Sequence, residues 1–335
     1  MGVLHCEGFE ANKSLTWLAR LYDGNFTNSN FLTGRLHGFG WNMGSTDELR
    51  TKSLGAQTEV VVGVAINHVN ATAAGLTTKL LQVLTGVNEQ VRLDFVGSGG
   101  GTYQLKLMRG ATQLAISGPI ATQAWVYVEL YVKPHTSTGA YELRLDEVST
   151  FSGSGVNTAN AGTNGCDVVA YFGPTGAFNI DDQYIVSGSS FLGSSVVEPI
   201  YPSADTATAD WLLSSGGTGY TLILDDPIYQ ASHDTTYIYL TAATGDSLFS
   251  MTDVGVITGA VHALSVVVTA FLASMGTRQM AARISDGTNT SVGSTQTVTA
   301  VSPGSFRSIF DTKPAGGSWS TSDVNGILAG VRGIS

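Results

Sequence analysis

Charged residues are scarce in this sequence. They make up 13% of its 335 residues, whereas average globular chains carry roughly a quarter. The 26 acidic residues outnumber the 16 lysines and arginines, which leaves a net charge of −10. Because the cations are few and scattered, the sequence argues against a broad face for nucleic acid. Charge is depleted at the centre of protein interfaces, so we expect this chain to contact copies of itself and other chains.

Cysteines and long apolar runs are also lacking. The two cysteines, Cys6 and Cys166, are too few to indicate a disulfide-stapled fold, and free thiols fit synthesis in a reducing cytoplasm. No run approaches the roughly 18 apolar residues of a membrane-spanning helix. Residues 1–14 have neither the basic nor the apolar part of a secretory signal. We therefore expect no membrane insertion.

Motifs of catalysis and metal binding are missing as well. No two histidines form an H-x-H or H-x-x-x-H pair, the spacing of many metal sites. No G-x-S-x-G nucleophile turn occurs. The glycines at 97–101 lack the lysine of a phosphate-binding loop. We therefore expect neither a cofactor nor an enzyme.

Alternating apolar and polar residues dominate what is present. Residues 125–133 place Val126, Val128, Leu130 and Val132 on one side of an extended chain. This period of two is typical of half-buried antiparallel strands, and regularly spaced turns indicate a β-sandwich. Similar runs lie at 58–69, 79–86, 89–97, 102–110, 111–118, 141–148, 166–173 and 178–186. The sequence predicts an all-β protein with helix below roughly a tenth of its residues.

Residues 187–210 interrupt this pattern. Serine, glycine, threonine and two prolines gather there, which is typical of a boundary between domains. We expect a first β-sandwich (jelly-roll) domain at 1–195 and a smaller C-terminal one at 196–335, with residues 187–210 as the bridge. A strand is predicted at 220–226 within the second domain.

The end of the chain has a different period. Val324, Ile327, Leu328 and Val331 recur at helical spacing, and Thr321 or Ser322 is suited to cap a helix. The sequence therefore predicts a short helix there.

Adjacent carboxylates, Asp181 and Asp182, are the first candidate site. Neighbours on a strand point to opposite faces, so the two could share an ion or a substrate only from a bulge or loop. Together with Asn179 they form a weak candidate metal set. We favour a structural role, in which they accept hydrogen bonds from loop amides.

Three aromatic residues are the second candidate site. Trp41 lies in a glycine-rich stretch, and Tyr103 and Trp125 lie in alternating strands. Aromatic rings at such positions pack in cores or present a face to a ligand. We favour core packing for Trp41 and expect Trp125 and Tyr184 to be largely buried. The alternative is glycan stacking by Trp41, Tyr103 and Trp125.

Several of these segments resemble one known family. The pair FE at 9–10, QAWVYVELYVKP at 123–134, YELRLDE at 141–147 and NIDDQYI at 179–185 are similar to concanavalin A-like (LamG-type) jelly-roll domains. The resemblance implies that the strand with the Asp pair runs beside the first strand. The glycosidase pattern E-x-D-x-x-E of that family is absent from ELRLDE, and Asn179, Asp181 and Asp182 make an incomplete calcium set.

The second half resembles the C-terminal part of tailed-bacteriophage virion proteins. The segments are WLL with YTLILDD at 211–226, TTYIYL at 235–240, and the ending at 314–334. The resemblance implies a structural protein of the virion, in the capsid decoration, collar or tail. It would be made in the bacterial cytoplasm and would assemble as a homo-oligomer with other virion proteins. The alternative function is a lectin-like module that binds a host-surface glycan.

Overall fold

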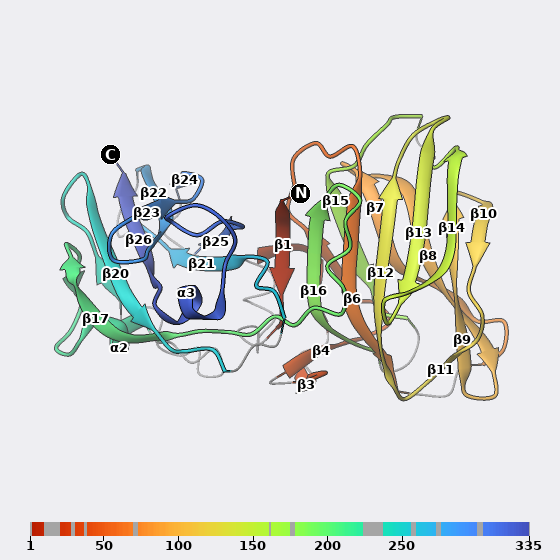
Figure 1. The fold of residues 1–335 in the computed structure, drawn as a ribbon, viewed down its shortest axis with the longest axis horizontal. Coiled ribbons are helices and arrows are strands. Elements are labelled where there is room, and N and C mark those ends of the chain that lie inside the picture. The colour runs from red at the N-terminus through yellow and green to blue at the C-terminus, as the bar shows by residue number, and fades with distance from the viewer. Residues whose placement is uncertain are drawn as a thin grey trace. The chain divides into compact units, whose positions relative to one another are not determined.

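The computed structural model describes residues 2–9, 21–27, 31–36, 39–69, 73–160, 162–174, 178–223, 237–255, 259–272, 276–299 and 304–334. Contacts divide the chain into two compact units, Met1–Val197 and Glu198–Ser335. Antiparallel strands make up nearly all of the regular structure (Figure 1). The helices α2 (Gly219–Ile223) and α3 (Thr321–Asn325) have five residues each. The predicted all-β class is therefore confirmed.

Two antiparallel eight-stranded sheets form the first unit. Sheet A has the order β14-β13-β12-β6-β16-β4-β3, with β1 also paired to β16. Sheet B has the order β10-β9-β8-β7-β15-β5-β2, with β11 also paired to β9. The bounds in sheet A are β1 Val3–Glu7, β3 Phe31–Thr33, β4 Phe39–Met43, β6 Val60–His68, β12 Trp125–Lys133, β13 Gly139–Leu145, β14 Val148–Val156 and β16 Phe178–Ser187. Those in sheet B are β2 Tyr22–Asn25, β5 Glu48–Thr51, β7 Thr77–Thr85, β8 Asn88–Gly99, β9 Thr102–Arg109, β10 Thr112–Ile116, β11 Ile120–Ala121 and β15 Val168–Phe172.

A shared apolar core joins the two sheets. In sheet A the alternating residues Val128 and Leu130 of β12 are buried, and in sheet B Leu105 and Leu107 of β9 are buried with them in one cluster. Burying apolar area is the main favourable term in folding. The period of two in the sequence therefore decides which side of each strand faces the core.

The last strand of this unit lies beside the first, as the jelly-roll resemblance implies. Strand β16 pairs with β1, with Val3 opposite Val186 and Cys6 opposite Tyr184. On its other side β16 pairs with β6, so β16 is an interior strand of sheet A (Figure 1).

Gly63 of β6 makes room for an aromatic ring on the outward side of sheet A. It stands opposite Tyr184 in the ladder. A Cβ added at Gly63 would lie 2.1 Å from a carbon of the Tyr184 ring. Glycine inside a strand often marks such a close approach, and here it allows the ring of Tyr184 to lie flat across the neighbouring strand.

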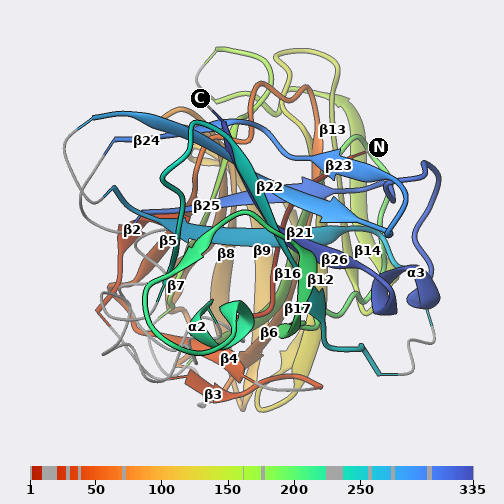
Figure 2. The same ribbon diagram turned by 90° about the vertical axis from the view of Figure 1, so that its left-hand side faces the viewer.

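The second unit is built on a six-stranded antiparallel sheet of order β17-β20-β26-β22-β23, with β24 also paired to β22. One side of this sheet packs with β21 and β25 around Ala282, Ile284, Phe310 and Trp319. Figure 2 shows these strands, with α2 beside β17. The bounds are β17 Pro202–Ala209, β18 Leu212–Leu213, β19 Ile238–Tyr239, β20 Gly245–Met251, β21 Leu264–Ala270, β22 Arg278–Ser285, β23 Thr290–Val292, β24 Gln296–Val298, β25 Gly304–Phe310 and β26 Leu328–Ile334.

The predicted helix at the end of the chain is wrong beyond its first turn. Helix α3 begins after the cap Ser320, whose side chain forms a capping box with Asp323. It ends at Asn325, and β26 follows as an interior strand of the sheet. In this strand Ala329 and Val331 share the buried side, whereas Leu328 lies on the other side. Glycine in the middle disfavours the helix.

Two further predictions in this half need correction. The strand predicted at 220–226 is replaced, over its described residues, by helix α2, whose first amides bond to Asp205. The bridge predicted at 187–210 has structure of its own. Its first part packs on sheet A through Phe191 and Leu192, and residues 202–209 form strand β17.

Among the described residues, no helix is long and apolar enough to cross a membrane.

We expect Gly63→Ala to destabilise the first unit. The added methyl group collides with the Tyr184 ring, and overpacking of this kind costs about 1–3 kcal/mol. Gly118→Ala is the matched control, because nothing lies within 4 Å of a Cβ there. Urea denaturation of both variants measures the difference. Equal midpoints would show that Tyr184 can move aside without loss.

Candidate functional site

The Asp181–Asp182 pair sits at an irregularity of strand β16. The pairing with β6 shifts register between Asp181 and Tyr184, and Asp182 has a φ of 49°. A bulge turns neighbouring side chains out of simple alternation. Both carboxylates are buried, at 2% and 3% exposure.

Protein donors occupy all four carboxylate oxygens of the pair. Asp181 accepts from the amide of Asp182 at 2.8 Å and from the amide of Arg35 at 2.7 Å. Asp182 accepts from the guanidinium of Arg35 and from the amide of Val197, both at 2.9 Å. The pair therefore ties together β16, the segment at Arg35 and the segment at Val197, in agreement with the structural hypothesis. Asn179, the third residue of the weak metal set, accepts a hydrogen bond from Asn42 at 2.7 Å.

Arg35 is the centre of this junction. Its guanidinium lies 4.7 Å from the centroid of the Tyr127 ring, pairs with Asp182, and donates to Ser194 and to the carbonyl of Ser195. The Arg35 side chain is only 10% exposed. Arginine suits such a position because its planar fork bonds several acceptors and stacks on aromatic rings.

Residues 191–195 cover part of the outward side of sheet A. Phe191 and Leu192 pack there against Tyr184 and its apolar neighbours. The amide of Gly193 donates to the buried carboxylate of Glu129 at 2.9 Å, and the Tyr184 hydroxyl bonds to the same oxygen. This part of the outward side of sheet A is thus covered by the chain itself.

Thiols and metal-ligand clusters offer no chemistry in the described part of the chain. No group of three His, Cys, Asp or Glu side chains there could hold a metal ion. Neither Cys6 nor Cys166 forms a disulfide bond with a described residue. Burial raises the pKa of the Cys166 thiol to about 12, and the thiol, unlike the thiolate, is a poor nucleophile.

The three candidate stacking residues do not form one site. Trp41 and Tyr103 are fully buried, at 0% exposure, so neither ring has a face open to a sugar. Their apolar strands place them in the core, which corrects the stacking hypothesis for these two. Trp125 is half-buried at the edge of the cluster around Tyr184, whereas we expected it to be largely buried. Tyr184 itself is 2% exposed.

The outward side of sheet B carries charged residues that the sequence did not single out, and they lie in and around one row that crosses five strands. Arg50, Ala170, Gln82, Arg92 and Met108 stand opposite one another across β5, β15, β7, β8 and β9. We call the outward side of these five strands the polar face. It is defined by Glu48, Arg50, Lys79, Gln82, Glu89, Arg92, Asp94, Lys106 and Phe172.

Ion pairs fix the charged groups of the polar face. The guanidinium of Arg92 donates to Glu89 at 2.8 Å and to Asp94 at 2.9 Å. Gln82 bonds to the other oxygen of Glu89. Such charge-assisted bonds are stronger than neutral ones and set the orientation of each group.

Apolar residues lie between the charged side chains. Leu84, Val168 and Ala170 form a small buried cluster, with Phe172 packed against it. The ammonium group of Lys79 lies 5.4 Å from the centroid of the Phe172 ring. An outward sheet face therefore combines a buried apolar floor with fixed polar groups.

Asp94 is unusually enclosed for a carboxylate on an outward face. Its side chain is 4% exposed. Burial raises the pKa of Asp94, and the hydrogen bond and charge of Arg92 only partly oppose this. Carboxylates whose pKa is shifted by burial and by a specific charged partner are common at functional sites.

Searches for known relatives give likeness of fold only. No protein family matches the chain, and no curated protein matches it in sequence. Solved structures similar to about half of the chain include domain 4 of the arabinanase AbnA from Geobacillus stearothermophilus, at 16% identity and a TM-score of 0.36, covering 56% of this chain and 93% of that one. The carbohydrate recognition domain of Emp47p has 12% identity and a TM-score of 0.34, covering 49% and 91%. An endo-β-1,4-glucuronan lyase from Trichoderma reesei has 11% identity and a TM-score of 0.32, covering 50% and 87%. No residue role is carried over from them.

We expect Asp182→Asn to weaken the first unit strongly. The substitution leaves the enclosed guanidinium of Arg35 without its counter-charge, and breaking a buried ion pair costs about 3–5 kcal/mol. Asp23→Asn is the matched control, because the Lys52–Asp23 pair is 3.6 Å long and 57% and 63% exposed. Exposed pairs contribute about 1 kcal/mol or less. Similar losses in the two variants on denaturant unfolding would contradict a special role for Arg35.

The raised pKa of Asp94 predicts a pH-dependent stability difference. The folded state binds the Asp94 proton more tightly than the unfolded state does, so its contribution to stability grows as pH falls through the folded pKa. We expect Asp94→Asn to be at least as stable as wild type at pH 7, with the difference shrinking at lower pH. Thermal melts from pH 7 to pH 4 measure this. A variant that is clearly less stable at pH 7 would show that the Arg92 pair outweighs burial.

Proposed function

We propose that the first unit is a lectin-like module that binds a glycan along the polar face of sheet B. The observation that carries this proposal is the fixed array around Arg92, with Glu89, Asp94 and Gln82 held by one another over an apolar floor.

Sugar chemistry matches such a surface. A sugar ring presents hydroxyl groups, which both donate and accept hydrogen bonds, and C–H groups, which are apolar. Carboxylates, amides and guanidinium groups bond to the hydroxyl groups, and the half-buried ring of Phe172 contacts the C–H groups. Groups that are already fixed lose little conformational entropy on binding. The array around Arg92 therefore favours a polar ligand with apolar ring faces.

The extent of the row favours a chain of sugars over a single ring. The row from Arg50 to Met108 crosses five strands. Neighbouring strands lie about 4.8 Å apart, so the row is about 19 Å long. Sheet A offers less open surface for the same task, because residues 191–195 cover part of it.

Binding without cleavage is part of the proposal. Glycoside hydrolysis needs one carboxyl group as acid and another as base or nucleophile, on either side of the scissile bond. On the polar face, Glu89 and Asp94 both hold the same guanidinium. Their lone pairs are directed to Arg92, which suits recognition of a ligand better than proton transfer.

A structural role in a virion is the second candidate, and one observation favours it. The edge strand β14 (VSTFSGSGV) carries no charge, and Val148 on it is 69% exposed. Long uncharged edge strands can pair with another chain. This agrees with the homo-oligomer expected from the low charge, and a glycan-binding module within a larger assembly would satisfy both candidates.

We expect Arg92→Lys to lose glycan binding. Lysine keeps the charge but cannot bond to Glu89 and Asp94 through a fork, so the array loses its order. Wild type is screened against an array of neutral and acidic oligosaccharides, and the affinity for the best ligand is then compared by calorimetry. The expected loss is about tenfold or more, which corresponds to one charge-assisted bond.

Arg144→Lys is the matched control for this experiment. Arg144 pairs with Glu142 two residues away on the outward side of sheet A, as Arg92 pairs with Asp94 on sheet B. The affinity of Arg144→Lys for the glycan should equal that of wild type. Binding lost equally in both variants, or no glycan bound by wild type, would contradict the proposal.

A further inference from the structure

A cavity lies in the second unit, apart from the polar face. It has a volume of about 230 Å³ and lies between β20, β17, β18, β19 and the start of α2. An engineered apolar cavity of roughly 150 Å³ holds one benzene molecule. The cavity in the second unit is therefore the size of a single six-membered ring with a substituent.

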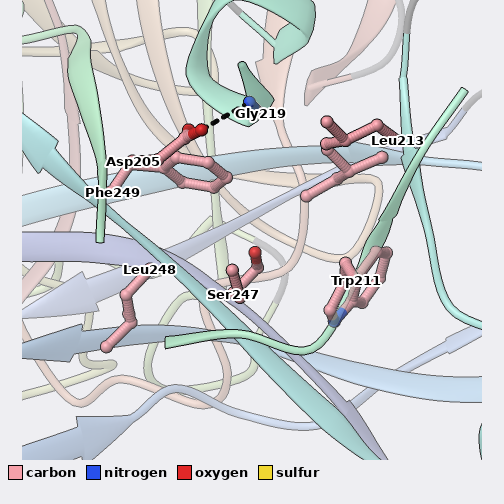
Figure 3. Close-up of a pocket in the computed structure, with 9 residues that line it drawn as sticks. Asp205, Trp211, Leu213, Gly219, Ser247, Leu248 and Phe249 are labelled. Carbon is pink, nitrogen blue, oxygen red and sulfur yellow. Dashed lines mark hydrogen bonds between the residues drawn. The ribbon is translucent and has the colours of Figure 1, made fainter. Parts of the chain in front are cut away.

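The lining of the cavity is mainly apolar. Trp211, Leu213, Ile238 and Phe249 contribute side chains from three strands and the chain beside them. Figure 3 shows Trp211, Leu213 and Phe249 around the open space. The indole nitrogen of Trp211 already donates to the carbonyl of Gly245 at 3.2 Å. What Trp211 adds to the cavity is thus apolar ring surface.

One polar side chain of the lining points into the cavity. Ser247 is only 2% exposed, and no described residue forms a hydrogen bond with its hydroxyl. Figure 3 shows the Ser247 oxygen directed into the space bounded by Phe249 and Leu213. The carboxylate of Asp205, by contrast, accepts from the amides of Gly219 at 2.8 Å and Tyr220 at 2.6 Å. The Ser247 hydroxyl is therefore open to the cavity and can bond to a ligand that carries one hydrogen-bonding group.

We infer that this cavity binds an aromatic ring that carries one hydroxyl group. The ring would contact Trp211, Leu213 and Phe249, and its hydroxyl would bond to Ser247. A monosaccharide does not fit this lining, because most of its hydroxyl groups would be buried without partners, which is costly. The ligand class is therefore that of a phenol, either as a small molecule or as a tyrosine side chain of another protein.

The first experiment uses p-cresol as the probe and the full chain. Calorimetry should show p-cresol binding with a Kd of about 1 mM or tighter. Toluene, which lacks the hydroxyl, should bind about threefold to tenfold more weakly, the worth of one hydrogen bond. In Ser247→Ala the two probes should bind equally. This variant removes only a hydroxyl that bonds to no described residue, so its folding should be unchanged.

Two further variants locate the binding. Ala209 lines the cavity, so Ala209→Leu should abolish binding of both probes by filling it. Ala204 is exposed on the same strand and is not part of the lining, so Ala204→Leu should bind as wild type does. Failure of p-cresol to bind would overturn the inference. So would tighter binding of methyl glucoside than of p-cresol, or binding that survives Ala209→Leu. Because no residue of the polar face is changed, glycan binding by the first unit serves as an independent readout.

Discussion

The contact between Arg35 and Asp182 holds together segments of the first unit that are far apart in the sequence. Asp182 belongs to the bulge of β16, whereas Arg35 follows β3 and also bonds to Ser194 and Ser195. This guanidinium is therefore one of the anchors of the segment that covers part of sheet A. An arginine enclosed to this extent needs a carboxylate beside it, which explains why two adjacent aspartates occur at the bulge and why they are anchors, not a reactive pair.

The two outward faces of the sandwich consequently have different roles. Sheet A uses its polar groups internally, since Glu129 and Tyr184 bond to the backbone that covers them. Sheet B keeps Lys79 exposed and Arg92 half-buried on its outward side. In a chain with so few charges, seven charged residues on one sheet face are a concentration that packing does not require. This asymmetry is the physical reason for proposing that a ligand binds on sheet B and not on sheet A.

Sequence patterns predicted the strands well and the candidate sites poorly. Residues 125–133 form β12 with the predicted bounds, because alternation and burial agree there. The segment 328–334 was misassigned because its apolar residues fit both a helix and a strand, and only the neighbours β20 and β22 decide between them. The polar face was missed for a related reason. Arg92 and Asp94 alternate with core residues within β8, but their positions opposite Gln82 and Lys106 arise from the register between strands, which no single segment reveals.

The position of β16 has a consequence for how the chain acquires its structure during synthesis. This strand lies between β6 and β4 and also pairs with β1, yet it is the last strand of the first unit to leave the ribosome. Until β16 is synthesised, sheet A consists of separate pieces with unpaired edges. The ribosome adds about 5–20 residues per second, so these edges stay unpaired for several seconds or longer. Pairing between residues almost 180 positions apart, such as Cys6 with Tyr184, makes folding slow. The interval in which these edges are open is when the chain is most exposed to aggregation and most dependent on chaperones.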